Sequence, residues 1–137
     1  MPVYLLDSNA LSDLIRNPGG TVSRRFEREA VDPSNELLTS IVTACEVRYG
    51  AVKKGSRMLS ERMDRTLEAV RVVPLSIGAD AAYAILRTDL ERKGQLIGPN
   101  DMLIAAHALA LNAILVTDNV REFKRVKDLK IENWLRS

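Results

Sequence analysis

The sequence has few residues that support thiol or imidazole chemistry. Cys45 is the only cysteine and His107 is the only histidine. A zinc site needs several such ligands, so a zinc protein is not expected. A single cysteine allows no internal disulfide, which favours an intracellular compartment. We expect Cys45 to be a small buried apolar side chain. His107 lies six residues beyond Asp101, which turns it away from that face of the helix, so we expect a core or partly exposed histidine.

Long apolar runs and phosphate-binding glycine motifs are also missing. No apolar stretch approaches 20 residues, and no charged segment followed by an apolar one opens the chain. We therefore expect a cytoplasmic protein without membrane contact. Neither G-x-G-x-x-G nor G-x-x-x-x-G-K-[ST] occurs, which argues against a dinucleotide or P-loop nucleotide site.

The composition is that of an ordinary folded chain of 137 residues. Apolar residues make up 46% and charged residues 28%, which fits one domain over residues 1–137. Lys and Arg number 20 against 18 for Asp and Glu, a net charge of +2. This balance is compatible with a polyanionic partner but does not require one.

Apolar periodicity predicts strands that alternate with helices. Predicted strands lie at 3–6, 37–41, 72–73, 114–116 and 130–131. Predicted helices lie at 9–16 (capped by Ser8 or Asn9), 22–30, 43–54, 59–70, 79–93 (ended by Gly94), 99–111 and 121–125. The alternation indicates an α/β fold: a three-layer domain whose central sheet is mainly parallel and flanked by helices.

Four acidic residues fall at or just after the carboxyl ends of predicted strands, where function gathers in open α/β sheets. They are Asp7, Glu46, Asp101 and Asp118. Four carboxylates at one edge repel each other unless a cation lies among them. Oxygen ligands suit Mg²⁺, with Mn²⁺ as a substitute, and such an ion can activate water against a phosphodiester.

Three of these acids also have plain structural explanations. Glu46 follows Thr43 by three positions, as in a capping box. Asp101, in a first helical turn, suits the helix dipole. Asp118 and Asn119 fit a turn after a strand. The acid that ends the first strand gains little there, so together the four favour a site.

Several stretches of the chain resemble the VapC toxins of the PIN-domain superfamily. They are Leu5-Leu6-Asp7-Ser8-Asn9, the run from Ser40 to Gly50, the run from Ile97 to His107, and Leu115-Val116-Thr117-Asp118-Asn119 with Glu122-Phe123. The ending Ile131-Glu132-Asn133-Trp134 also looks like the family. The order and spacing of these pieces make the resemblance specific, and it covers almost the whole chain.

The resemblance implies a Mg²⁺-dependent endoribonuclease whose metal-binding core is Asp7, Glu46 and Asp101. Family members carry a further acid two residues after the threonine that ends the fourth strand. Asn119 stands there in this chain, and the acid is one residue earlier, at Asp118. Either Asp118 serves from the shifted place or Asn119 acts as a neutral ligand. Two hydroxyls, those of Ser8 and Thr117, are implied as supporting or substrate-positioning groups.

The resemblance also implies partners and a setting. VapC proteins pair with a VapB-type antitoxin, which fills the toxin's groove and binds operator DNA, and they commonly form homodimers. Their substrates are loops of tRNA or rRNA, and cutting them arrests translation in the bacterial cytoplasm. Basic runs on two predicted helices, around Arg24 to Arg28 and Lys53 to Arg65, are usually solvated faces but would suit phosphate contacts in such an enzyme.

Two other functions remain open from the residues alone. An aspartyl phosphotransfer domain also places an Asp at the end of its first strand, but receivers and haloacid-dehalogenase-type enzymes add acids that Ser8 and Asn9 replace here. A non-catalytic protein- or RNA-binding module would use the acids only as caps. Metal binding and its loss on Glu46→Gln would separate that module from an enzyme.

Overall fold

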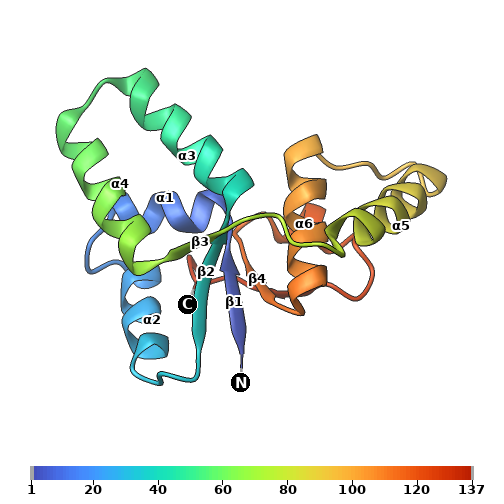
Figure 1. Cartoon of the computed structure of the whole chain (residues 1–137), viewed down its shortest axis with the longest axis horizontal. Helices are drawn as coiled ribbons and strands as arrows, with labels where there is room; N and C mark the ends of the chain where they lie inside the picture. The colour runs from blue at the N-terminus through green and yellow to red at the C-terminus, as the bar shows by residue number, and fades with distance from the viewer. Residues whose placement is uncertain (1, 137) are drawn as a thin grey trace.

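Five parallel strands form the centre of the molecule (Figure 1). The computed structural model describes residues 2–136. The strands are β1 (Val3–Leu6), β2 (Glu36–Ser40), β3 (Arg71–Val73), β4 (Ile114–Val116) and β5 (Lys130–Glu132), in the order β3-β2-β1-β4-β5. All four pairings are parallel, so the carboxyl ends meet at one edge. The predicted α/β class is confirmed.

Helices cover both faces of this sheet. They are α1 (Ser8–Arg16), α2 (Thr21–Ala30), α3 (Ile41–Lys54), α4 (Arg57–Ala69), α5 (Ala79–Arg92), α6 (Pro99–Leu111) and α7 (Val120–Phe123). In Figure 1 the first four lie on one side of the strands, and α5 and α6 lie on the other. No helix within residues 2–136 is long and apolar enough to span a bilayer.

The alternation of β1 divides the core into two layers. Leu5 packs with the α5 and α6 side, whereas Tyr4 and Leu6 pack with the side of α1 and α2. Leu5 lies opposite Leu38 on β2 and Leu115 on β4, and all three are buried in the same cluster. Burying each such side chain contributes about 2 kcal/mol, so the register of β1 is strongly specified. β1 is thereby held at the centre of the sheet.

Two predicted helix starts are wrong, and both corrections concern the site. Asp7 itself caps α1, because its side chain accepts a hydrogen bond from the Ala10 amide at 3.2 Å. Ser40 caps α3 and accepts from the Val42 amide, so the helix begins two residues before Thr43. The capping box predicted for Glu46 is therefore absent, since Glu46 is the sixth residue of α3.

The two residues that stand alone in the composition have different environments. His107 is fully buried, the first of the two expected environments, and its Nδ1 lies 2.8 Å from the Ser40 hydroxyl. Cys45 is exposed, which contradicts the prediction of a buried side chain. The reason is the orientation of α3: Thr43 and Ala44 face the interior, and the next residue points to solvent.

Candidate functional site

The predicted acids come from elements that end or begin at the carboxyl edge of neighbouring strands. Asp7 follows β1, and Glu46 lies on α3, which starts directly after β2. Asp101 lies in the first turn of α6, where Pro99 takes the first helical position. The segment after β4 supplies the rest: Thr117, Asp118 and Asn119. Because β1 lies between β2 and β4, this edge collects all of them.

Asp7 is the most buried carboxylate of the group, with 4% of its surface exposed. Its pKa is raised from 3.8 to about 6, mainly by burial and to a smaller degree by the charge of Asp101. Hydrogen bonds from the Thr117 hydroxyl and the Ala10 amide act in the opposite direction. Asn9 adds a contact from its Nδ2 at 3.3 Å. Asp7 thus carries negative charge that its neighbours only partly compensate.

Glu46 is held in place by polar side chains from two other helices. The Ser8 hydroxyl donates to its Oε1 at 2.5 Å, and Asn100 Nδ2 lies 3.5 Å from its Oε2. Ser8 is the first residue of α1, the helix that Asp7 caps, and its supporting role stays a prediction. The short hydrogen bond from Ser8 fixes the orientation of the Glu46 carboxylate.

The pKa of Asp101 responds to the charges of two other acids. Its pKa is raised first by burial, then by the charge of Glu46, then by that of Glu122. Glu122 was not among the predicted site residues, although it lies in the quoted stretch after the fourth strand. Its carboxylate accepts a hydrogen bond from Asn119 Nδ2 at 3.1 Å. A first-turn acid on a helix that begins at this edge is the signal that could have found it.

Asp118 has different neighbours from the other predicted acids. Its Oδ1 accepts hydrogen bonds from Asn133 Nδ2 at 3.0 Å and from Arg136 Nε at 3.1 Å. These two donors lower its pKa. Its backbone amide donates to Asn9 Oδ1 at 2.8 Å. The side chain is therefore engaged by the C-terminal segment, while its backbone is tied to the loop that holds Asp7.

The donor set fits a hard divalent cation. Within residues 2–136 no group of three acidic, histidine or cysteine side chains is placed to hold a metal ion by itself. Mg²⁺ commonly takes only one or two protein carboxylates and completes its shell with water and phosphate oxygens. The raised pKa values of Asp7 and Asp101 indicate uncompensated negative charge that such a cation would neutralise. These two residues would hold it, with Glu46 and Glu122 beside them.

The chain is similar to known proteins in both sequence and structure. The model of the PIN domain matches residues 4–129. Ribonuclease VapC2 of Rickettsia felis is 37% identical over 96% of this chain and 98% of its own. The tRNA(fMet)-specific endonuclease VapC of Shigella flexneri is 35% identical over 96% of this chain and 97% of its own.

A solved structure agrees with the sequence relatives. The crystal structure of VapBC2 from Rickettsia felis, bound to a DNA fragment of its promoter, contains a chain with a TM-score of 0.88 and 36% identity. The match covers 96% of this chain and 98% of that one. With the parallel sheet and the acids at its carboxyl edge, these matches show that the chain belongs to the VapC family of PIN-domain proteins.

Proposed function

We propose that this chain is a metal-dependent endoribonuclease and the toxin of a VapBC-type pair. The observation that carries the proposal is that the buried Asp7 and the half-buried Asp101 both have raised pKa values at the carboxyl edge of a VapC scaffold. The Shigella flexneri relative is named for its action on tRNA(fMet), so tRNA is the first substrate to try. Ribosomal RNA is the second. Cleavage of either would arrest translation.

The residues at the acidic edge would have different roles in cleavage of a phosphodiester bond. A bound Mg²⁺ or Mn²⁺ supplies a Lewis acid that lowers the pKa of water and offsets charge on the phosphate. Asp7 and Asp101 would hold the ion, and Thr117 orients Asp7 by its hydroxyl. Ser8 and Asn100 keep Glu46 fixed beside them. Asn119 donates a hydrogen bond to Glu122, whose charge acts on Asp101.

The direct test is cleavage of a tRNA transcript by the purified chain with Mg²⁺, followed by mapping of the new 5′ ends. The expected result is one cut or a few cuts in a single-stranded loop. Intact tRNA and intact rRNA after incubation with the folded, partner-free protein would refute the proposal.

Which acid completes the site is tested by a pair of variants. We propose that Glu122 serves in the site and that Asp118 supports it from outside. The sequence leaves the fourth ligand open between Asp118 and Asn119, and a ligand role for either stays a prediction. Glu122→Gln is expected to lower kcat about 100-fold, because it removes charge beside Asp101. Asp118→Asn removes a partly exposed ion pair and is expected to cost less than about 10-fold. The reverse order of the two effects, measured by single-turnover cleavage, restores Asp118 as the fourth acid.

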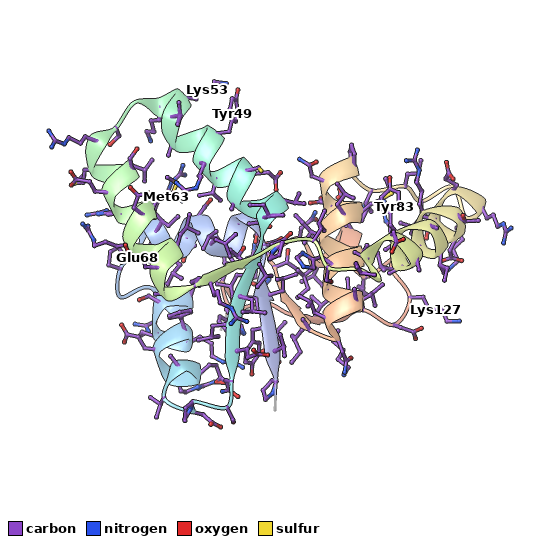
Figure 2. The ribbon with its side chains drawn as sticks, viewed as in Figure 1. Tyr49, Lys53, Met63, Glu68, Tyr83 and Lys127 are labelled. Atoms are coloured by element: carbon purple, nitrogen blue, oxygen red, sulfur yellow. The ribbon has the colours of Figure 1, made fainter. Side chains whose placement is uncertain are left out.

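We further propose that a VapB-type antitoxin covers the arm formed by α3 and α4. Figure 2 shows Tyr49 and Lys53 near the end of α3 that lies away from the sheet. Apolar side chains are exposed along this arm: Tyr49 at 64%, Val52 at 78% and Met58 at 62%. Exposed apolar surface of this kind marks a protein interface. Operator DNA would be bound through the antitoxin, and the expected homodimer stays a prediction.

Val52→Asp is expected to weaken antitoxin binding about 10-fold or more, because it places a charge in an apolar contact. Cleavage by the free chain is expected to stay unchanged. Val31→Asp is the matched control, since Val31 is 82% exposed at the end of α2, away from the arm. Titration calorimetry measures the affinity of each variant for the antitoxin. Equal affinities for the two variants would contradict this surface.

A further inference from the structure

A hollow rich in arginine lies between α2 and the segment that follows β5. Its volume is about 440 Å³. The residues that line it are Thr21, Arg24, Arg25, Arg28, Asn133, Trp134 and Arg136. Four of these seven are arginines, and we call this feature the arginine hollow. Guanidinium groups bind phosphate oxygens through paired N–H donors, so this lining matches a phosphate ligand.

One of the four arginines has a structural role. Arg25 pairs with Glu132 at 3.0 Å and with Glu29 at 3.5 Å. Its guanidinium also lies 5.1 Å from the centroid of the Trp134 ring, which packs edge-on against Tyr4. These contacts tie α2 to the C-terminal segment and keep the arginine hollow in a fixed shape.

The other three arginines retain free donors. Arg24 is exposed and forms no ion pair within residues 2–136. The Arg28 side chain is 71% exposed, and its nearest carboxylate, Glu29, is 3.9 Å away. The Arg136 side chain is 79% exposed and uses Nε for Asp118. A guanidinium has five N–H donors, so each of the three can bind a further acceptor.

A short chain of hydrogen bonds joins the arginine hollow to the acidic edge. Arg136 donates to the carboxylate of Asp118, whose backbone amide donates to Asn9 Oδ1. Asn9 in turn contacts Asp7 through its Nδ2. A ligand that bridges the acidic edge and the arginine hollow would therefore meet a metal-binding end and a cationic end. A single nucleic-acid strand has phosphates at successive positions that can occupy both.

We propose that the arginine hollow binds a backbone phosphate of the RNA substrate, flanking the one that is cut. The inference rests on the proposed ribonuclease function and adds a substrate subsite to it. Arg24 and Arg28 lie four residues apart on one face of α2 and supply the cationic wall. Asp118 is then a positioning residue, since it aligns Arg136 for the strand. An acidic protein segment has similar chemistry, but the link to Asp7 favours the strand that the site cuts.

The test is RNA binding by Arg24→Gln/Arg28→Gln in an Asp7→Asn background, which prevents cleavage. Two lost contacts with a single strand are expected to reduce the slope of log Kd against log salt by about 1.4. RNA affinity at physiological salt is expected to fall roughly 10-fold. With Asp7 intact, KM is expected to rise by a similar factor while kcat stays the same. Arg24→Lys/Arg28→Lys is expected to recover the salt slope, because the charge is kept.

The matched control is Arg57→Gln/Arg65→Gln, which removes two exposed arginines from α4. Equal salt slopes and KM values for this control and for the α2 variant would overturn the subsite, while wild-type cleavage would leave the ribonuclease function standing. A loss of antitoxin affinity with unchanged RNA binding would also overturn it and assign the arginine hollow to the protein partner. Wild-type protein that neither cuts nor binds RNA would overturn both proposals.

Discussion

Asp7→Asn is expected to abolish RNA cleavage and to make the protein more stable. Cleavage should fall about 1,000-fold or more, because the variant loses the charge that would hold the cation. Asparagine is as good an N-cap as aspartate, so the start of α1 should survive. The folded chain should gain stability because the variant no longer holds a charged carboxylate, only 4% exposed, near other acids.

The raised pKa of Asp7 makes the stability of the folded chain depend on pH. The pKa of Asp7 is raised from 3.8 in the unfolded chain to about 6 in the folded one. The folded state therefore binds more protons between these values, and its stability falls as pH rises from about 4 to about 6. Above that window the full cost, about 3 kcal/mol, is present. Asp7→Asn should recover most of it at pH 7 in the absence of divalent ions.

The measurement is urea unfolding of wild type and Asp7→Asn from pH 4 to pH 8, with EDTA present. His107 adds an opposite dependence, since burial lowers its pKa and stability falls as pH drops below about 6.5. That contribution is common to both proteins and cancels in the difference between them. The prediction fails if Asp7→Asn is less stable at pH 7, or if it cuts RNA within tenfold of wild type.

Removal of divalent cations is expected to stop cleavage as completely as the loss of Asp7 does. EDTA should abolish activity, and Mg²⁺ or Mn²⁺ should restore it, because oxygen ligands suit both ions. The physical reason is that burial, and then the charge of neighbouring acids, raises the pKa values of Asp7 and Asp101, so that a cation among them would be favourable. Titrating Mg²⁺ into the metal-free protein should also raise its unfolding temperature by linkage.

Asp7→Asn is the control for this linkage and should gain little stability from Mg²⁺. The two readouts separate catalysis from folding, since the thermal shift needs no RNA. Cleavage that continues at full rate in EDTA, yet disappears in Asp7→Asn, would show that the carboxylate acts without a metal.

Local signals in the sequence predict most of the fold. Pro99 takes the first position of α6, and Asn112 ends that helix in the left-handed region at φ 52°. Gly55 ends α3 in the same region. Apolar runs such as residues 114–116 mark buried strands. These features depend on neighbours within a few residues, so a single sequence carries them.

Only the tertiary structure decides how the acids are used. The sequence by itself places Asp7, Glu46, Asp101 and Asp118 near strand ends, whereas their partners come from distant segments. Asp118 is engaged by residues 15 and 18 positions away, and Glu122 acts on Asp101 from another helix. Side-chain direction and strand order depend on packing between remote elements, which no local pattern encodes.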